Sequence, residues 1–550
     1  MPGDELLFVP LGGCGEIGMN LNLYGTAGKW LMVDLGVTFG DDSTPGIDVI
    51  MPDPAFIEAA TDDLAGLVLT HAHEDHIGAV PHLWERLKCP LYATSFTASI
   101  LRRKLREAGL EMRAPITEIP LSGKFDVGPF SLELITLTHS IPEPNAVVIR
   151  TSHGTVLHTG DWKFDPDPLV GSTTDKAALR KLGDEDVLAM VCDSTNVFTQ
   201  GESGSEGELR KSLTELVSRY TKGRVAAACF ASNVARLETM ARVAEANGRH
   251  AALIGRSLWN FYEASKENGY LTDIPPFLTE HDVGRLPPEK IFLICTGSQG
   301  EPRAAMARIA SLTHPRVQLG DGDVTIFSSR IIPGNEKSIA RLQNQLVRLG
   351  VEVVTEKDHF IHVSGHPARD ELTHMYEMVR PRMVVPVHGE LRHLREQAKL
   401  AKACQIPEAP EVVNGQALRL APGSPHIVAE VTSGRLVLDG NRLIDIDSSM
   451  VRARRRMILD GTAAVTVVID AKGYLVADPV ISAPGIIADE GDDKLVADLV
   501  WAVTVAVENL PVSERRKDAP VHEAARLALR RTLVAQRGHK PVTQVHVVRI

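Results

Sequence analysis

Over residues 5–192 the chain alternates short apolar runs with breaks at glycine and polar residues. Apolar runs at 6–9, 21–24 and 30–33 predict adjacent antiparallel strands. Further strands are expected at 131–138, 146–151, 155–159 and 187–192, with helices near 81–88 and 96–108. The pattern predicts a layered α/β unit whose polar residues gather at strand ends, where ligands usually bind.

From residue 206 the apolar spacing becomes helical, because Leu209, Leu213 and Leu216 share one helix face. Strand-like and helical segments then alternate: strands at 225–230, 251–254, 291–295 and 324–328, helices at 233–247, 302–311 and 335–349. Such alternation predicts a mostly parallel sheet. Residues 206–357 are therefore expected to form a second domain.

The pattern in the last third of the chain predicts that the chain first returns to the first unit and then forms a separate unit. The apolar run 384–387 ends at His388, a helix is expected to about residue 403, and short strands over 428–446. The final unit is expected to contain a hairpin (464–469 and 475–481), two helices (492–509 and 519–536) and a strand (545–548). This pattern predicts a small C-terminal α/β domain.

Composition limits the class of protein. A chain of 550 residues is too long for one core and predicts two to four domains. The net charge of −11 argues against coating nucleic acid through bulk electrostatics, although a local basic groove stays compatible with it. There is no long apolar run, no secretion signal and no CxxC pair among six cysteines. We therefore predict a cytoplasmic protein with no membrane partner.

The most informative motif lies at 71–76, between an apolar strand at 66–70 and the start of a helix. It holds four candidate metal ligands in six positions: His71, His73, Asp75 and His76. Imidazole and carboxylate suit zinc, or manganese where oxygen ligands dominate. Because neighbouring side chains point in divergent directions, this loop is expected to hold two metal ions.

Two metal ions need more ligands than this loop supplies. His139, Asp161 and His388 each follow a predicted strand and are flanked by small residues. Asp34 ends another strand and is expected to orient a histidine ligand from behind. Alone, a strand-end histidine is more often a surface residue, and Asp161 could cap a turn. The loop at 71–76 makes these residues candidate ligands.

The His-x-His-x-Asp-His pattern at 71–76, with Asp34 before it and His139 and Asp161 after it, resembles the metallo-β-lactamase superfamily. That resemblance implies an αβ/βα sandwich with metals at one edge. The superfamily includes lactonases, thioesterases and nucleases, so the motif alone does not identify a substrate.

The predicted insert narrows the resemblance to the β-CASP nucleases, whose later motifs match Asp193, His366 and His388. The glycine-rich segment 12–20 and the C-terminal domain are similar to bacterial ribonuclease J, over essentially the whole chain. The implied fold is a metallo-β-lactamase sandwich with an inserted β-CASP α/β domain and a small C-terminal α/β domain. The expected boundaries are 1–205 and 358–449 for the sandwich, 206–357 for the insert, 450–459 for a linker and 460–550 for the C-terminal domain.

The resemblance also implies the site. One metal would be held by His71, His73, His139 and Asp161, and the other by Asp75, His76, Asp161 and His388. A 5′-phosphate pocket would comprise Ser232, Asn233, His362, Val363, Ser364, Gly365 and His366. Asp34 and Asp193 would support ligands. Asp75 would orient the nucleophile, and His366 or His388 would protonate the leaving 3′ oxygen; the sequence does not choose between them.

The implied function is a metal-dependent ribonuclease acting in RNA maturation and decay. It would remove nucleotides 5′→3′ from 5′-monophosphorylated RNA and also cut internally. It would use two divalent ions, with zinc favoured and manganese or magnesium as alternatives. Single-stranded RNA is the expected partner, and the family implies a homodimer or homotetramer and an RNA-degradation complex.

Two other functions stay open. One is a different hydrolase on the same fold, such as a transfer-RNA 3′ processing enzyme or a thioester or lactone hydrolase. The insert and the motif at 362–366 argue against it. The other is an inactive RNA-binding subunit, against which the presence of every expected ligand argues.

Overall fold

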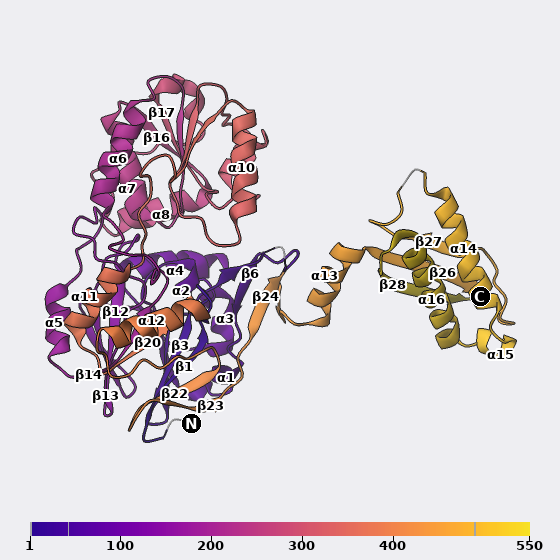
Figure 1. Cartoon of the computed structure of the whole chain (residues 1–550), viewed down its shortest axis with the longest axis horizontal. Helices are drawn as coiled ribbons and strands as arrows, with labels where there is room; N and C mark the ends of the chain where they lie inside the picture. The colour runs from indigo at the N-terminus through magenta and orange to yellow at the C-terminus, as the bar shows by residue number, and fades with distance from the viewer. Residues whose placement is uncertain (1–2, 42, 489–490) are drawn as a thin grey trace. The chain divides into compact units, whose positions relative to one another are not determined.

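The computed structural model describes residues 3–41, 43–488 and 491–550 (Figure 1). The chain divides into two compact units. The first contains the residues up to Thr38 and Ile50–Arg435, and the second contains Phe39–Val49 and Leu436–Ile550. The domain boundaries expected from the sequence stay predictions.

The first unit contains two facing β-sheets. The eight-stranded sheet has the order β23-β22-β1-β3-β4-β7-β8-β9. Its strands are β1 (Leu6–Gly12), β3 (Leu21–Thr26), β4 (Lys29–Val33), β7 (Leu64–Val68), β8 (Leu91–Ala93), β9 (Ile116–Glu118), β22 (Gln416–Ala421) and β23 (His426–Glu430). The antiparallel pairing of β1, β3 and β4 confirms the arrangement predicted for the first strands.

The six-stranded sheet has the order β10-β11-β12-β13-β14-β20. Its strands are β10 (Lys124–Val127), β11 (Phe130–Thr136), β12 (Asn145–Thr151), β13 (Gly154–His158), β14 (Val187–Asp193) and β20 (Met383–Val387). β20, which follows the insert, pairs in parallel with β14. Both sheets contribute to one buried core, in which Phe8 and Tyr24 of the first meet Leu132 and Val191 of the second.

Helices cover the outer faces of this sandwich. Leu179, Leu372 and Leu400 pack on the outer face of the six-stranded sheet. The helices of the sandwich are α1 (Ala55–Glu58), α2 (Glu74–Ile77), α3 (Val80–Leu87), α4 (Ser95–Glu107), α5 (Lys176–Gly183), α11 (Arg369–Val379) and α12 (Leu391–Ala403). Two short parallel strands, β2 (Cys14–Gly15) and β21 (Gly389–Glu390), join the N-terminal segment to the end of β20.

The insert is a separate α/β layer within the first unit. Its parallel sheet has the order β16-β17-β15-β18-β19. The strands are β15 (Val225–Ala228), β16 (His250–Ile254), β17 (Ile291–Cys295), β18 (Val324–Phe327) and β19 (Glu352–Val354). The helices are α6 (Glu206–Ser218), α7 (Val234–Ala246), α8 (Arg256–Glu267), α9 (Ala305–Ala310) and α10 (Glu336–Arg348). The parallel pairing of these strands confirms the predicted parallel sheet. Figure 1 shows α6 and α7 on one side of the sheet and α10 on the other.

The second unit is built on a three-stranded sheet, β27-β26-β28, packed against two long helices. Its elements are β24 (Arg435–Asp439), β25 (Arg442–Asp445), α13 (Ser449–Asp460), β26 (Thr462–Ile469), β27 (Val480–Ser482), α14 (Asp493–Glu508), α15 (Val512–Arg515), α16 (Asp518–Arg537) and β28 (Val542–Arg549). Two further short strands, β5 (Thr38–Phe39) and β6 (Val49–Pro52), lie at the two ends of Phe39–Val49, the N-terminal segment that belongs to this unit.

The turn of the expected C-terminal hairpin forms, because the Asp470 carboxylate accepts the N–H groups of Lys472 and Tyr474. Leu475 bridges Ile469, but the second strand is confined to β27 at 480–482 and does not extend over 475–481. The segment 450–459, whose place as a linker stays a prediction, is helical, and Ser448 caps α13 by accepting the N–H of Val451.

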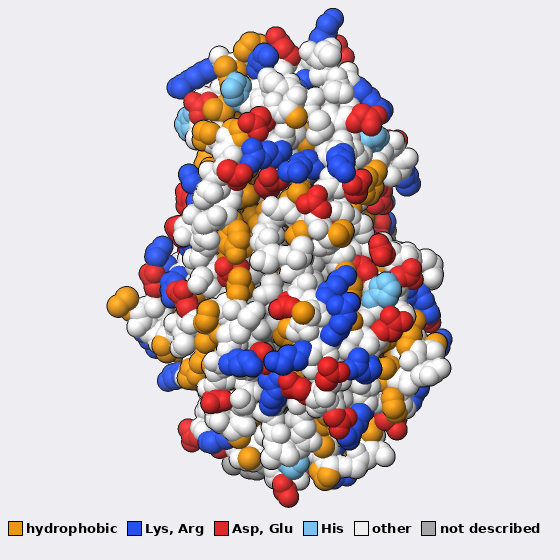
Figure 2. All heavy atoms as spheres, turned by 90° about the vertical axis from the view of Figure 1, so that its left-hand side faces the viewer, with side chains coloured by type: hydrophobic (Ala, Val, Ile, Leu, Met, Phe, Trp, Pro, Cys, Tyr) orange, Lys and Arg blue, Asp and Glu red, His pale blue; other side chains and the backbone are white. Residues whose placement is uncertain are grey.

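Two surface features bear on possible partners. Among the described residues, no helix combines the length and the apolar character that a membrane span requires. On the face of the molecule shown in Figure 2, basic and acidic side chains are interspersed. That face therefore carries no continuous basic patch that would attract RNA by charge alone.

Candidate metal centre

The loop between β7 and α2 carries the first candidate ligands. The backbone of a neighbouring segment holds this loop in place, because Leu35 N–H donates to the His76 carbonyl at 2.7 Å. Asn20 donates from both its backbone and its side chain to the Asp75 carbonyl, each at 3.0 Å. The carbonyl groups of the ligand residues are thus bonded to the sandwich, which leaves their side chains free to converge.

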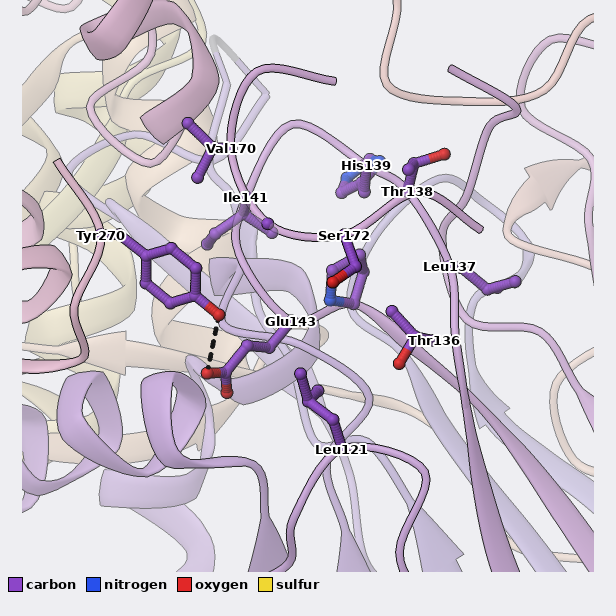
Figure 3. Close-up of a pocket in the computed structure, with 12 residues that line it drawn as sticks. Leu121, Thr136, Leu137, Thr138, His139, Ile141, Glu143, Val170, Ser172 and Tyr270 are labelled. Atoms are coloured by element: carbon purple, nitrogen blue, oxygen red, sulfur yellow. Dashed lines mark hydrogen bonds between the residues drawn. The ribbon is translucent and has the colours of Figure 1, made fainter. Parts of the chain in front are cut away.

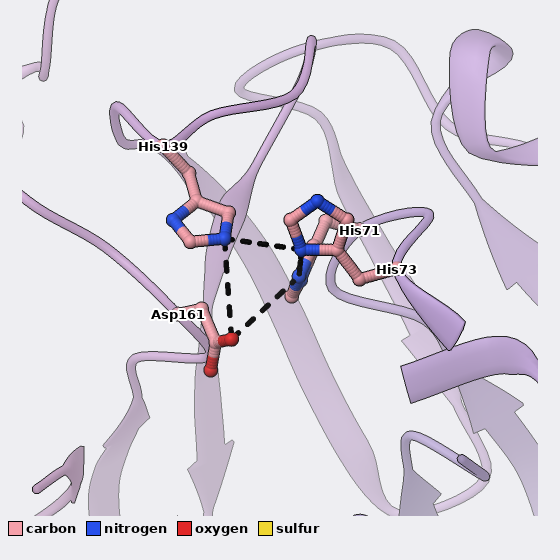
Figure 4. A group of neighbouring side chains, drawn as sticks. All are labelled: His71, His73, His139 and Asp161. Atoms are coloured by element: carbon pink, nitrogen blue, oxygen red, sulfur yellow. Dashed lines mark hydrogen bonds and ion pairs between the residues drawn. The ribbon is translucent and has the colours of Figure 1, made fainter. Parts of the chain in front are cut away.

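Four of these side chains form the first cluster (Figure 4). His73 Nδ1 lies 3.1 Å from His71 Nε2 and 3.1 Å from His139 Nε2. The Asp161 carboxylate lies 3.9 Å from His71 Nε2 and 4.0 Å from His139 Nε2. The structure therefore brings together the four residues expected to hold the first metal.

The second cluster shares Asp161 with the first. Asp161 Oδ2 lies 3.2 Å from His76 Nε2, and Asp161 Oδ1 lies 3.8 Å from His388 Nε2. Asp75 Oδ2 lies 3.0 Å from His388 Nε2 and 3.6 Å from His76 Nε2. Asp161 thus belongs to both candidate groups, and its carboxylate would be shared if both groups held an ion.

The donor atoms of the first cluster fit a metal ion. Nitrogen and oxygen ligands about 2.1 Å from a tetrahedral ion lie about 3.4 Å apart, close to the spacings seen here. Asp161 Oδ1, which faces the second cluster, is buried without a hydrogen-bond partner among the described residues, and a cation there would satisfy it. Burial holds the pKa of His71 and His139 well below the usual range and lowers that of His73 to about 4. These imidazoles are neutral at pH 7, the form that binds metals.

The second cluster combines two carboxylates, Asp75 and Asp161, with two imidazoles, His76 and His388. Burial disfavours protonation of His388, but nearby carboxylates outweigh burial and raise its pKa to about 9. These carboxylates are Asp161, Asp75 and Asp193. A divalent cation would balance them, which supports the second metal position.

Asp34 lies behind the second cluster, where it was expected to orient a histidine. His76 Nδ1 lies 2.7 Å from Asp34 Oδ2, which leaves Nε2 facing Asp161. Thr70 holds the Asp34 carboxylate by donating from its N–H at 2.8 Å and its hydroxyl at 2.9 Å. The geometry is that of a carboxylate fixing the ring orientation of a metal-binding histidine.

Two supporting contacts were not anticipated from the sequence. His388 Nδ1 bonds the Thr195 hydroxyl at 2.7 Å, and His139 Nδ1 bonds the Gly365 carbonyl at 2.5 Å. Thr195 and Gly365 lie far along the chain from the ligands that they contact, so no local pattern marks these pairs. Their effect is to aim both Nε2 atoms at the cluster.

Asp193 supports a third candidate group, with Asp161, His366 and His388. Asp193 Oδ2 lies 2.8 Å from His366 Nδ1 and therefore fixes that ring, with the His366 side chain 22% exposed. His388 is nearly buried, at 3% exposure. Of the two histidines predicted as proton donors, His366 is thus the more accessible.

The turn 362–366 lies directly against the metal cluster, through the contact of Gly365 with His139. Asn196 joins this turn to β14, because its Nδ2 donates to Ser364 Oγ at 2.7 Å and to the His366 carbonyl at 3.0 Å. The sequence offered one signal for Asn196, its position three residues after Asp193. The turn places hydroxyl and imidazole donors beside the candidate metals, as a phosphate would require.

The two residues of the insert expected to help bind phosphate have a different arrangement. Asn233 caps α7, accepting the N–H of Arg236 at its Oδ1. Among the described residues, no hydrogen bond joins Ser232 or Asn233 to the turn 362–366. Their part in phosphate binding stays a prediction.

A further contact ties the His139 loop to the insert. Tyr270 donates its hydroxyl to Glu143 Oε1 at 3.1 Å, and Glu143 Oε2 accepts the Phe96 N–H at 2.8 Å. Figure 3 shows these side chains lining a pocket with His139. The loop that follows His139 is therefore hydrogen-bonded both to α4 and to the insert.

Comparisons with known proteins follow the same division of the chain. Residues 20–217 match the metallo-beta-lactamase superfamily, and 222–346 match the ribonuclease J beta-CASP domain. Residues 350–407 match the Zn-dependent metallo-hydrolase RNA specificity domain, and 449–550 match the ribonuclease J C-terminal domain. Ribonuclease J of Sinorhizobium meliloti is 42% identical over 552 residues, covering 100% of this chain and 98% of that protein. The chain belongs to the ribonuclease J family.

Other relatives support this membership. Ribonuclease J of Mycolicibacterium smegmatis is 41% identical and covers 85% of this chain and 84% of its own length. Ribonuclease J 1 of Streptococcus pyogenes is 35% identical, covering 95% and 94%. A crystal structure of a protein of unknown function from Enterococcus faecalis shares the fold, with a TM-score of 0.53 and 15% identity over 76% of this chain and 100% of that chain.

Membership in the ribonuclease J family confirms the predicted family, fold class and enzyme class, a metal-dependent hydrolase. The buried histidine and aspartate clusters confirm a metal site in coarse terms. The ligand assignments, the number of ions and the choice of zinc stay predictions.

The packing of Gly36 against the ligand loop yields a first prediction. A Cβ at Gly36 would lie 1.7 Å from the Asp75 carbonyl oxygen and 2.6 Å from the His76 N. Gly36→Ala is therefore expected to push the ligand loop away and destabilise the fold by about 1–3 kcal/mol. Bound metal and the melting temperature of the variant would measure both effects. Gly284→Ala is the control, because nothing lies within 4 Å of its Cβ position; equal behaviour of the two variants would contradict the prediction.

Proposed function

We propose that this chain is a metal-dependent ribonuclease that removes nucleotides 5′→3′ from 5′-monophosphorylated RNA and also cuts RNA internally. One observation supports it above the others. The turn 362–366 touches the metal cluster directly, with the Gly365 carbonyl 2.5 Å from His139 Nδ1. A phosphate held by Ser364 and His366 would place the first internucleotide bond beside the clusters.

The residues have distinct parts in the proposed reaction. When bound, two divalent ions supply positive charge that polarises a phosphodiester and lowers the pKa of a water molecule. Asp161 links the two ligand groups, and Asp75 orients the attacking water by accepting its hydrogen bond. Zinc is the favoured ion for this set of imidazole and carboxylate donors, with manganese or magnesium as alternatives.

We assign proton donation to His366 and metal binding to His388. His388 Nε2 faces Asp75 Oδ2 at 3.0 Å, inside the second cluster. Of the two ring nitrogens of His366, only Nδ1 is hydrogen-bonded among the described residues, to Asp193, so Nε2 can deliver a proton to the leaving 3′ oxygen. The products of this reaction are a 5′-phosphate and a 3′-hydroxyl.

The test compares one RNA with a 5′-monophosphate, a 5′-triphosphate or a 5′-hydroxyl, each digested with defined metals. Mononucleotides are expected at once from the monophosphorylated RNA. From the other two RNAs they should appear only after an internal cut has created a new 5′-monophosphate end. Chelation should abolish both activities, and added zinc or manganese should restore them. Release of only long fragments from the monophosphorylated RNA would contradict the exonuclease part.

Parallel assays of thioester hydrolysis, lactone hydrolysis and RNA binding address the alternatives. Hydrolysis of a thioester or a lactone without RNA cleavage would favour another hydrolase of this fold. RNA binding without cleavage, in a protein that purifies without metal, would favour an inactive RNA-binding subunit. A homodimer or homotetramer, a cytoplasmic location and partners in an RNA-degradation complex stay predictions.

A further inference from the structure

Arg330, in the insert, is hydrogen-bonded to the sandwich next to the turn 362–366, which is expected to bind the 5′-phosphate. It follows β18, and its Nη1 donates to Asn196 Oδ1 at 2.6 Å. The other end of the Asn196 amide bonds Ser364 and the His366 carbonyl. One asparagine therefore connects this guanidinium with the turn expected to hold the 5′-phosphate.

The backbone around Arg330 is held in place by Gln299. The Gln299 amide donates to the Arg330 carbonyl at 2.8 Å and accepts the N–H of Ile332 at 2.9 Å. Gln299 is itself buried, at 5% exposure. Because the Gln299 side chain bonds the backbone at both Arg330 and Ile332, the backbone that carries the guanidinium is held in place.

Three cations lie near the turn 362–366: Lys163, Arg236 and Arg330. The first two already pair with an acidic side chain. Lys163 pairs with Asp165 at 2.7 Å, and Arg236 pairs with Glu206 at 2.8 Å. Arg330 forms no ion pair with an acidic side chain among the described residues, and it is exposed. The pKa of His362 is held well below its usual range by burial and by the positive charges of Arg236, Arg330 and Lys163. Arg330 thus supplies a free positive charge close to the turn.

A guanidinium in this position suits a phosphate. Its planar fork can bond two phosphate oxygens at once, and its charge strengthens each bond. Asn196 occupies one nitrogen, which leaves the others for a ligand.

We propose that Arg330 binds the 5′-terminal phosphate of RNA together with the turn 362–366 and sets the preference for a monophosphorylated end. This inference rests on the proposed function. The phosphate would then be held from two sides, by the guanidinium of the insert and by the hydroxyl and imidazole of the main domain. An RNA with a 5′-hydroxyl offers Arg330 no charge to bind.

The test is the ratio of kcat/KM for 5′-monophosphorylated over 5′-hydroxyl RNA. Arg330→Gln is expected to lower kcat/KM on the monophosphorylated RNA by about 10- to 100-fold, the value of a charge-assisted hydrogen-bond pair. The loss on 5′-hydroxyl RNA should be much smaller, because that RNA has no terminal phosphate for the guanidinium to bind. Arg330→Lys, which keeps the charge without the fork, should fall between. Arg348→Gln is the matched control, because Arg348 is an exposed arginine at the end of α10 in the same insert.

Each outcome either supports or overturns the proposed role of Arg330. A fall in the ratio for Arg330→Gln but not for Arg348→Gln supports the inference. An unchanged ratio, or an equal loss on both RNAs, overturns it and leaves the proposed function standing if the unmodified chain prefers the monophosphate. Absence of RNA cleavage by the unmodified chain overturns the proposed function and this inference with it.

Discussion

Asp161→Asn is expected to lower RNA cleavage by about a thousandfold or more, a loss typical of removing a key charge-stabilising group from an active site. Asp161 is the one residue present in both candidate ligand groups. Asparagine keeps the shape of the side chain but removes the negative charge that two cations would share. The variant should therefore bind less metal while its circular dichroism stays that of the unmodified chain.

The control for this prediction is Asp126→Asn, which removes an exposed carboxylate from β10 in the same sandwich. It should leave both activity and bound metal unchanged. Full activity of Asp161→Asn at normal metal content would show that the two clusters are not the catalytic centre.

The second large effect concerns the stability of the insert. Arg236 and Glu206 form an ion pair at 2.8 Å, with side chains only 0% and 4% exposed. Arg236 also donates to the Ser328 carbonyl at 2.8 Å, which ties α6, α7 and the end of β18 together. Arg236→Met is expected to destabilise the insert by about 3–5 kcal/mol, because the buried Glu206 carboxylate loses the cation that is paired with it.

Hydrogen exchange of peptides from α6 and α7 would measure this loss. The double variant Arg236→Met with Glu206→Gln should recover part of the stability, because no unpaired charge is then buried. Arg219→Met is the control: its partner Glu215 lies on the same helix with 72% exposure, and the loss should be below about 1 kcal/mol. Similar losses for both arginine variants would refute the burial argument.

The sequence predicted the elements of the first unit well, because apolar runs and glycine breaks are local signals. The ligands could be predicted for the same reason, since His71, His73, Asp75 and His76 lie in one short motif and the others follow strands. The family resemblance supplied the pairing of ligands into two groups, and the structure brings the same groups together.

Contacts between distant segments could not be predicted in this way. Arg330 and Asn196 are 134 residues apart, and Thr195 and His388 are 193 apart, so no periodicity connects them. The helix α13 was expected only as a linker, because five of its 12 residues are charged and only Val451 is buried. Its stability depends on a capping serine, a weaker signal than an apolar face.

The second cluster has a consequence for the order in which the protein is made. His388 lies 313 residues after Asp75, and the whole insert separates them. A nascent chain that has left the ribosome only as far as the insert contains every ligand of the first cluster but lacks the last ligand of the second. Under the proposed function, the growing chain cannot cut the messenger RNA from which it is being translated until β20 has emerged and joined β14.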